Sequence, residues 1–367
     1  MEKFILDDCK LQWHTDRLNA WLRGERIAPI TIDCALTTHC TYKCKYCYGQ
    51  LQLINQKPHL SPEVINSFLD DAAEIGVKAI SLVSDGESTC NPYVYDAILR
   101  GKRNGIDMAL GTNGFLLKEE RLEEILPCLT YLRFNISAGE RDAYCDIHGV
   151  SGQCYDQVIH NILKCVEIKR RRRLDVTIGL QMVLIPELKH QIIPLTRLGK
   201  ELKTDYLVIK HCSDDKDHSL GVDYEKYHDM EGLLHEAEAY SDENYQVSVK
   251  WSKIMSGGKR SYKRCLGPQF QLQISGSGIV APCGGFFSDE YKKYHIGDIT
   301  KQRFKNIWLS DRYREVMDFI SSDQFDARTD CTSLCLQHKV NEFLDKLEKG
   351  QQRKPCPLPS PRHINFI

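Results

Sequence analysis

Long apolar runs are absent from this 367-residue sequence, which has no stretch of the roughly 18 consecutive apolar residues that a membrane-spanning helix needs. A secretory signal is missing as well, because the N-terminus MEKFILDDCKLQWHTDRL is charged from its second residue and has no apolar core. Neither sign of charge dominates: 49 basic residues stand against 50 acidic ones, so no strong field would attract nucleic acid or an anionic membrane. These absences predict a cytoplasmic protein that binds neither nucleic acid nor membrane.

Cysteine, by contrast, is abundant, with 16 residues in the chain. Thiols stay reduced in the cytosol, so a framework of disulfides is not expected there. The abundance therefore favours metal binding or catalysis by some of these thiols.

Strands and helices alternate through the middle of the chain, as in a parallel α/β sheet with right-handed crossovers. We expect strands at 30–36, 79–83, 107–110, 131–136, 175–184 and 206–210. Helices are expected from 61 onward and at 93–102, 119–126, 155–168 and 191–202, the first capped by Ser61 with Pro62 at its first helical position. Periodicity alone fits both an open (β/α)6 partial TIM barrel and a doubly wound sheet.

The pattern changes after residue 210. A charged stretch at 214–243 holds one expected helix, a strand follows at 246–250, and Ser275-Gly276-Ser277 marks a hairpin between strands at 269–274 and 278–281. Two helical stretches, near 304–320 and 334–349, precede a Pro-rich, extended tail from 354. We divide the chain into a lead-in (1–29), a core (30–212), a linker with a helix (213–250) and a small α+β cysteine-rich domain (251–367).

Three cysteines follow the first expected strand directly: Cys40, Cys44 and Cys47. Loops at the carboxyl ends of parallel strands are where α/β proteins build their sites. Three thiolates can hold three irons of a [4Fe–4S] cube and leave the fourth open. The alternatives are chance and a zinc loop, but structural zinc usually takes four ligands in two closely spaced pairs.

The spacing C-x3-C-x-aromatic-C resembles that of the radical S-adenosylmethionine (radical SAM) superfamily. The resemblance implies a partial TIM barrel, a [4Fe–4S] cluster, and S-adenosylmethionine bound to the open iron by its amino and carboxylate groups. An external electron donor such as flavodoxin or ferredoxin would reduce the cluster, and cleavage of the sulfonium would release a 5′-deoxyadenosyl radical. By the same resemblance, Tyr46 would lie against the adenine.

Further motifs support the resemblance over residues 30–210. Ser84-Asp85-Gly86-Glu87 is similar to the Gly-Gly-Glu motif that receives the methionine ammonium; Gly86 would permit close backbone approach and Glu87 would supply the carboxylate. The turn with Asn113 resembles the TNG turn of the family, and Ser137 falls in a stretch similar to the one near the ribose and carboxylate. His148 stands in a loop where the family often has arginine.

A second group of cysteines fills the last third of the chain: Cys265, Cys283, Cys331, Cys335 and Cys356. The hairpin should bring the first two together, and Cys331 and Cys335 share one face if that turn is helical. Four thiolates from two elements suit either a second [4Fe–4S] cluster or structural zinc. The spacing resembles the SPASM/twitch extension of radical SAM enzymes, which implies one auxiliary cluster here. Cys331 and Cys356 compete for the place of its fourth ligand.

Cys212 ends the last strand of the core, on the side where a substrate should bind. The leading hypothesis is removal of a hydrogen atom from a small polar substrate of the sugar or cyclitol type, followed by loss of an electron to the auxiliary cluster. An alternative is a redox-neutral epimerase in which Cys212 returns a hydrogen atom. Modification of a ribosomal peptide is a third hypothesis, and an iron–sulfur or zinc-binding interaction protein is the non-enzyme alternative.

Overall fold

A computed structural model describes residues 4–51, 59–331, 335–351 and 360–367. The strands are β1 (Thr31–Cys34), β2 (Ala79–Leu82), β3 (Asp107–Thr112), β4 (Leu129–Asn135), β5 (Thr177–Leu184), β6 (Tyr206–His211), β7 (Gln246–Val249), β8 (Gln271–Ile274), β9 (Ile279–Ala281) and β10 (Gly297–Asp298). They form one sheet in the order β10-β9-β8-β1-β2-β3-β4-β5-β6-β7. Within the described residues its edges are β7 and β10, so the sheet is an open partial barrel, as expected.

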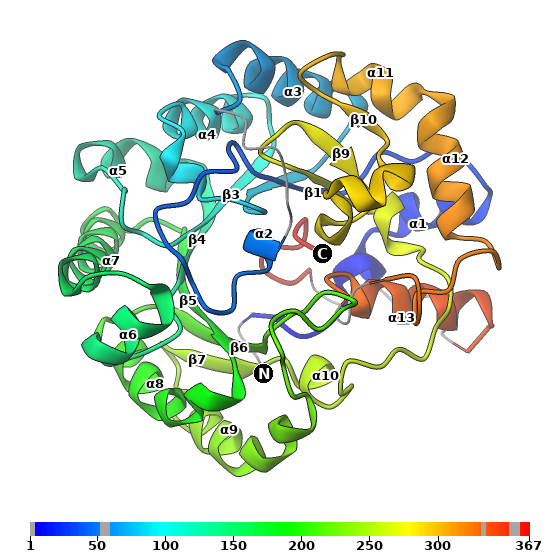
Figure 1. Cartoon of the computed structure of the whole chain (residues 1–367). Helices are drawn as coiled ribbons and strands as arrows, with labels where there is room; N and C mark the ends of the chain where they lie inside the picture. Colours follow the sequence, from blue (N-terminus) through cyan, green and yellow to red (C-terminus); the bar gives the residue numbers. More distant parts are fainter. Residues whose placement is uncertain (1–3, 52–58, 332–334, 352–359) are drawn as a thin grey trace.

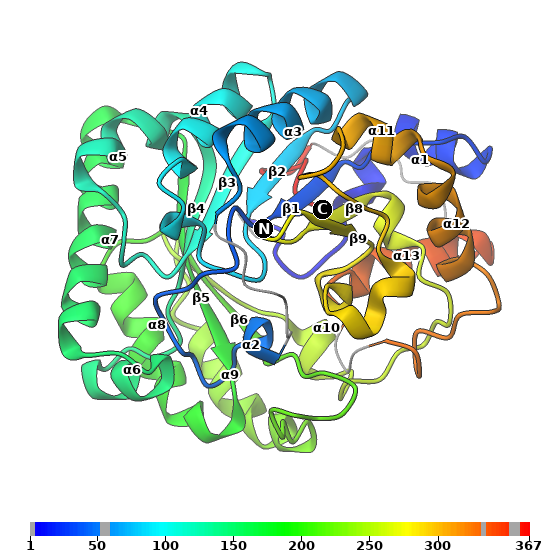
Figure 2. The ribbon, with the colours of Figure 1, turned by 45° about the horizontal axis from the view of Figure 1, so that its top comes forward.

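Most helices surround this sheet, whereas α2 (Tyr48–Leu51) lies over the middle of the ring of strands (Figure 1, Figure 2). The helices other than α2 are α1 (Thr15–Leu22), α3 (Pro62–Ile75), α4 (Val94–Arg103), α5 (Glu119–Ile125), α6 (Arg141–His148), α7 (Gly152–Arg172), α8 (Ile192–Glu201), α9 (Glu231–Glu238), α10 (Trp251–Ile254), α11 (Phe304–Leu309), α12 (Asp311–Ile320) and α13 (His338–Glu348).

Helix α3 shows how local sequence sets these elements. The Ser61 hydroxyl accepts a hydrogen bond from the backbone N–H of Val64 (3.4 Å), and Gly76 ends the helix in the left-handed conformation (φ 95°). Between these ends, an apolar stripe that includes Ile65, Phe68 and Leu69 is buried. Full burial of each such side chain contributes roughly 1.5–3 kcal/mol.

The last third of the chain extends the barrel instead of forming a separate sheet. Strand β8 pairs in parallel with β1, in the register Thr31↔Gln271 and Asp33↔Gln273. Strands β9 and β10 continue that edge in the antiparallel sense, β9 returning from the expected hairpin. At the other edge β7 pairs in parallel with β6. The six expected core strands are therefore joined by neighbours on both sides.

Helix α6 differs from the sequence expectation, which placed Asp146 to Gly149 in a loop. The segment is the end of an eight-residue helix, and Gly149 follows as its left-handed C-cap (φ 64°). The helix is short and its first turn is polar, so its apolar periodicity is weak. Its end places the His148 side chain in the protein interior, with no measurable exposure.

We call the lumen the space that the inward-facing residues of the barrel line. These residues include Asp33, Ser81, Arg133, Gln181, Lys210, Lys250, Gln271 and Gln273. The segment 360–367 lies across the lumen, and the chain's end is inside the ring of strands (Figure 1). Lys10 holds it there, because its ammonium donates to the carbonyls of His363 (3.2 Å) and Phe366 (2.9 Å). The ring of Phe366 packs on that of Tyr131 at 4.9 Å between centroids.

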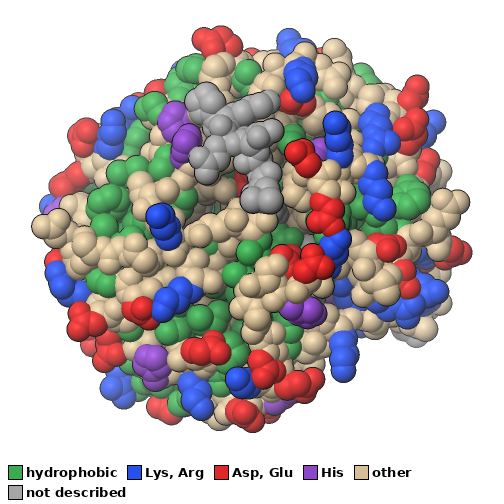
Figure 3. Space-filling model, in the orientation of Figure 1, with side chains coloured by type: hydrophobic (Ala, Val, Ile, Leu, Met, Phe, Trp, Pro, Cys, Tyr) green, Lys and Arg blue, Asp and Glu red, His purple; other side chains and the backbone are tan. Residues whose placement is uncertain are grey.

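Basic and acidic side chains are interspersed over the face of the molecule seen in Figure 3. This agrees with the even balance of charge in the sequence. No helix of the described segments combines the length and the apolar character that crossing a bilayer would require.

Candidate functional site

A cavity of about 460 Å³ occupies the lumen. It reaches from a floor that includes His363, Phe366 and Ile367 to the loops at the carboxyl ends of β1, β2 and β3. The sequence-predicted residues that line it are Cys40, Cys44, Tyr46, Cys47, Ser84, Asp85, Gly86, Glu87, Asn113 and Cys283. Ser137, Cys212, Cys265, Cys331 and Cys335 are described too but are not among its lining residues. The fold thus brings one member of the second thiol group to the cavity of the first.

The three thiols of the first group lie on the loop between β1 and α2. The end of α6 supports this loop, because the backbone N–H of Lys43 donates to the carbonyl of His148 (3.0 Å) and that of Lys45 to Ile147 (2.9 Å). The Tyr42 N–H reaches the Cys40 sulfur at 3.5 Å. Burial raises the pKa of Cys40 to about 12 and also that of Cys44, whose pKa the neighbouring thiols raise further. Binding to iron, which requires thiolates, would offset this cost.

His148 is bonded at both ring nitrogens. The backbone N–H of Ser137 donates to Nε2 at 3.3 Å, so the ring proton lies on Nδ1, which donates to the Cys44 sulfur at 3.0 Å. The ring packs on Tyr144, with centroids 4.3 Å apart. Burial lowers the pKa of His148 to about 3, so the ring is neutral. The sequence placed His148 where the family often has arginine; the structure places its ring against a cysteine of the loop.

The Glu87 side chain is buried and its carboxylate is fixed by four hydrogen bonds. Oε1 accepts from Thr89 N (3.0 Å), Thr89 Oγ1 (2.7 Å) and Thr112 Oγ1 (2.8 Å), and Oε2 accepts from Asn113 N (2.6 Å). Oε1 is crowded with donors, whereas Oε2 has room for another one. A carboxylate held in this way at the cavity wall suits the recognition of an ammonium group.

The two residues before Glu87 connect β2 to other parts of the site. A Cβ on Gly86 would lie 2.1 Å from the carbonyl oxygen of Thr37, so glycine is required for the packing of this turn on the loop that leads to Cys40. The Asp85 carboxylate accepts from Ser275 Oγ (2.6 Å) and from Gly276 N (3.0 Å). Gly86 therefore serves contact between two loops, and Asp85 ties the first site to the hairpin of β8 and β9.

The other predicted ligand-binding residues have defined places. Asn113 donates from Nδ2 to Thr41 Oγ1 (3.1 Å), beside the cysteine loop. The Ser137 hydroxyl accepts from the backbone N–H of Val183 (3.1 Å) and is fully buried, behind the cavity wall. Burial raises the pKa of Tyr46 far above its usual value, so its hydroxyl stays protonated.

The second thiol group lies near the N-terminal end of α13. Burial raises the pKa of Cys265, and repulsion by Cys335, Cys331 and Cys283 raises it further. The pKa of Cys283 is raised by burial and then by Cys331 and Cys335. Four thiols from the segments at 265, 283 and 331–335 are thus mutual neighbours. The competing candidate, Cys356, lies outside the described residues.

Side chains around this group suit a negatively charged centre. Asn341 on α13 accepts at Oδ1 from the backbone N–H groups of Leu266 (2.7 Å) and Gly267 (2.9 Å). Its Nδ2 then points to the sulfurs of Cys335 (3.6 Å) and Cys265 (3.8 Å). Proximity to the thiols of Cys331 and Cys335 raises the pKa of Arg260, against the effect of its burial. Asn341 could not be selected from the sequence, because nothing local marks an asparagine in a helix as a partner of Cys265, 76 residues away, or of Cys335, 6 residues away.

Both thiol groups fit iron–sulfur clusters by the chemistry of their donors, with three cysteines in the first and four in the second. No three His, Cys, Asp or Glu side chains of the described segments converge tightly enough to hold one metal ion. Sulfurs that bind different irons of a cluster stand farther apart than the ligands of a single ion.

Cys212 is fully buried. Its thiol donates to the carbonyls of Ser213 (3.4 Å) and Tyr46 (3.7 Å), and its backbone N–H is bonded to the carbonyl of Leu184 (3.0 Å). Burial raises the pKa of this thiol to about 12. The residue is near the site but is turned away from the cavity.

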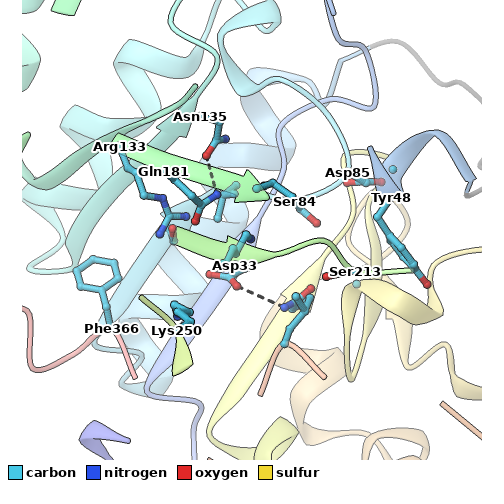
Figure 4. Close-up of a pocket in the computed structure, with 18 of the residues that line it drawn as sticks. Asp33, Tyr48, Ser84, Asp85, Arg133, Asn135, Gln181, Ser213, Lys250 and Phe366 are labelled. Atoms are coloured by element: carbon cyan, nitrogen blue, oxygen red, sulfur yellow. Dashed lines mark hydrogen bonds between the residues drawn. The ribbon is translucent and has the colours of Figure 1, made fainter. Parts of the chain in front are cut away.

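The lumen also contains charged residues that the sequence analysis did not select. Figure 4 shows Asp33, Arg133 and Lys250 around one part of the cavity, with Ser84, Asp85 and Tyr48 farther along it. Lys210 and Lys253 line the same space. The amides of Gln271 (3.1 Å) and Gln273 (3.3 Å) donate to the Asp33 carboxylate. Each residue is an isolated polar position in or beside a strand, so no spacing in the sequence reveals the group.

Comparison with known proteins gives two family matches. The radical SAM superfamily matches residues 35–197, and the SPASM iron–sulfur cluster-binding domain matches residues 265–336. The chain is 24% identical to the AdoMet-dependent heme synthase of Methanosarcina barkeri over 312 residues, which cover 79% of this chain and 85% of that protein. It is 20% identical to the tungsten-containing aldehyde ferredoxin oxidoreductase cofactor-modifying protein of Pyrococcus furiosus, over 81% of this chain and 85% of that one.

Among solved structures, Streptococcus suis SuiB bound to S-adenosylmethionine superposes with a TM-score of 0.64 at 16% identity. The superposition covers 84% of this chain and 72% of SuiB. At this level of identity the likeness is one of fold alone.

Proposed function

Because this chain belongs to the radical SAM superfamily and carries a C-terminal SPASM domain, we propose that it oxidises a small polar substrate of the sugar or cyclitol type in the lumen. The enzyme binds a [4Fe–4S] cluster and S-adenosylmethionine through the first domain and an auxiliary iron–sulfur cluster through the second. When bound and reduced by an external flavodoxin or ferredoxin, the first cluster and S-adenosylmethionine supply a 5′-deoxyadenosyl radical that takes one hydrogen atom from the substrate. The substrate radical would then lose one electron, for which the auxiliary cluster would be the acceptor, and one proton to solvent, so the product would have two hydrogens fewer.

One observation carries the oxidation hypothesis: the two thiol groups meet at one cavity. Cys40, Cys44 and Cys47 line one part of it, and Cys283, with Gly284 and Gly285, lines another. A substrate in this space would lie next to both the site of hydrogen removal and an electron acceptor. Through Cys283, an auxiliary cluster would lie close enough to that substrate to accept its electron.

Different residues of the chain would bind the two clusters, S-adenosylmethionine and the substrate. Cys40, Cys44 and Cys47 would hold the first cluster, and Cys265, Cys283, Cys331 and Cys335 the auxiliary one. Glu87 would bind the methionine ammonium, Tyr46 would adjoin the adenine, and the amides of Gln181, Gln271 and Gln273 would bind substrate hydroxyls. The floor segment (360–367) closes one end of the lumen and would limit the access of bulk water, which would protect a radical from side reactions.

Cys212 does not favour the epimerase alternative. A hydrogen donor must reach the substrate radical from the cavity, and the buried Cys212 thiol points to the carbonyls of Tyr46 and Ser213 instead. Oxidation is therefore the better-supported of the two reactions.

The test has two parts. Anaerobically reconstituted protein with reductant should cleave S-adenosylmethionine slowly to 5′-deoxyadenosine without any substrate; absence of the product would refute radical SAM chemistry. A panel of sugars and cyclitols should then be screened for faster 5′-deoxyadenosine formation. The product of a hit should be two hydrogens poorer and carry no deuterium from D2O. A product of unchanged formula with one deuterium would refute the oxidation.

A further inference from the structure

Four cationic side chains face the middle of the cavity: Arg133 from β4, Lys210 from β6, Lys250 directly after β7 and Lys253 from α10. None of the four belongs to an ion pair within the described part of the chain. The Arg133 Nε is buried and has no hydrogen-bond partner there. A guanidinium held at a cavity wall without an ion-pair partner is costly, and a ligand in the cavity would meet its outer nitrogens, not the shielded Nε.

The strands on both sides of Arg133 carry glycine at the position beside it. In register it stands between Gly111 on β3 and Gly179 on β5. A Cβ on Gly111 would already lie 3.7 Å from the Arg133 guanidinium, and one on Gly179 would lie 2.1 Å from the ring of Tyr206, which leans over it. The guanidinium lies 5.6 Å from the ring centroid of Tyr131, whose face stabilises its charge. Gly111 thus leaves room beside the guanidinium, Gly179 leaves room for the ring of Tyr206, and Tyr131 supports the guanidinium from one side.

The side-chain carboxylates of the described residues do not balance this charge. Among those that line the cavity, Asp33 lies with these cations, and burial raises its own pKa to about 6. Asp7, near Lys250 and Lys253, is bonded to Ser252 Oγ (2.7 Å) and N (2.9 Å). Asp85 and Glu87 have hydrogen-bond partners at the loops, and Asp8, which also lines the cavity, is mostly exposed.

The cations repel one another across this space. Burial lowers the pKa of Lys210 to about 7, and the charges of Lys253 and Arg133 contribute to that shift. Burial also lowers the pKa of Lys250, again with a contribution from Lys253. In a space of low polarity, an anion placed among these groups would relieve the repulsion and restore their full charge.

We propose that the substrate of this enzyme is anionic and that its carboxylate or phosphate group binds in the lumen against Arg133, Lys210 and Lys250. The planar guanidinium fork matches either anion, and the two ammonium groups add charge without demanding a fixed geometry. The inference rests on the proposed function, whose substrate it narrows to acids or phosphate esters. Lys253, between the lumen and Cys283 and Cys335, would extend the positive field toward the auxiliary cluster.

The test measures anion binding to the enzyme reconstituted with both clusters and saturated with S-adenosylmethionine. Tricarballylate and sn-glycerol 3-phosphate are the two probes, and tricarballylamide and glycerol are their uncharged counterparts. Anaerobic calorimetry should detect binding of one or both anions and none of the uncharged molecules. Which anion binds more tightly would distinguish a carboxylate substrate from a phosphate ester.

Variants locate the binding. Arg133→Gln and Lys250→Gln should each weaken anion binding about tenfold or more, while Lys102→Gln and Arg103→Gln, exposed on α4, should change it less than about twofold. Arg133→Lys keeps the charge in case Arg133→Gln does not fold, and should retain part of the affinity. Binding that the cavity variants leave unchanged, or that the uncharged probes share, would overturn the inference.

Formation of 5′-deoxyadenosine in the same samples distinguishes a failure of the anionic-substrate inference from a failure of the proposed function. Cleavage of S-adenosylmethionine without anion binding would refute the anionic substrate and leave the radical chemistry in place. Anion binding without cleavage would refute the proposed function and leave only an anion site.

Discussion

Replacement of Glu87 by glutamine changes one oxygen to an NH2 group in a pocket whose hydrogen bonds are all defined. The amide can orient in two ways. With its oxygen toward Thr89 and Thr112 it keeps three hydrogen bonds, but its NH2 then faces the N–H of Asn113. The opposite orientation keeps the bond from the Asn113 N–H and lets the NH2 donate to the two threonine hydroxyls, but it sets the NH2 against the backbone N–H of Thr89. Either orientation therefore leaves one buried backbone N–H without an acceptor.

Two separate losses follow from this geometry. The unsatisfied backbone N–H should cost about 1–3 kcal/mol of folding stability. Loss of the charge-assisted bond to the methionine ammonium should cost about 1.5–3 kcal/mol of S-adenosylmethionine binding, which corresponds to roughly a 10- to 150-fold weaker Kd. Both clusters should remain, because Glu87 is not a cysteine ligand. An anaerobic equilibrium titration measures the Kd, and denaturant unfolding measures the stability.

Thr89→Val is the matched control. It removes one hydrogen bond from the same carboxylate, that of Thr89 Oγ1, and keeps the charge and nearly the shape of the side chain. It should cost about 1 kcal/mol of stability but change the Kd for S-adenosylmethionine less than about threefold. Equal Kd values for wild type and Glu87→Gln, with both clusters present, would refute the assignment of the ammonium site.

Other predictions concern the clusters, their surroundings and the reaction. Reconstituted protein should hold about eight irons and eight sulfides, and the triple change of Cys40, Cys44 and Cys47 to alanine should remove about half; stoichiometric zinc in anaerobically purified protein would contradict the second cluster. His148→Phe removes an N–H donor from the Cys44 sulfur and should lower the reduction potential of the first cluster in an EPR-monitored titration, an unchanged potential counting against this role. Burial lowers the pKa of His211 to about 3. Between pH 6.5 and pH 3 the unfolded chain therefore binds a proton at His211 that the native protein does not bind. The contribution of His211 to the free energy of unfolding is complete above pH 6.5, and about 2 kcal/mol of it is lost by pH 5. His211→Phe should remove that part of the acid sensitivity in unfolding curves at pH 7 and pH 5. Cys212→Ala should retain turnover, measured once a substrate is known. If the variant lost turnover and the wild-type product took up deuterium from D2O, the reaction would be an epimerisation.

The barrel could be predicted from the sequence because its signals are local. Apolar runs of strand length, a serine cap with proline behind it and the Ser-Gly-Ser hairpin each depend on a few neighbouring residues, and the structure contains the elements they indicated. The six core strands were found for this reason. The pairing of β8 with β1 was not foreseen, since it joins residues about 240 positions apart and no local pattern encodes it.

The candidate site likewise has parts that local sequence signals predict and parts that depend on long-range contacts. Three cysteines within eight residues can be recognised as a ligand loop in any fold, and strand ends place the residues around Glu87 beside it. The bond from His148 to Cys44 could not be inferred, because it depends on α6 ending at residue 148 and turning its last side chain inward. Gly86 permits a close backbone approach, as expected, but the approaching atom is the carbonyl oxygen of Thr37 on another loop, which no local pattern reveals.

The lumen charges show a more general limit. Strand β4 alternates Tyr131, Arg133 and Asn135 with the buried Leu132 and Phe134, a pattern typical of a strand with one face in water. Alternation identifies the polar face but not what that face meets, and in a barrel it meets the inside. The distinction has an energetic consequence, because the same arginine is nearly free of cost in water and expensive in a lumen. A charge that would be unremarkable on a surface therefore becomes, once the sheet curves around it, an indication of what the enzyme binds.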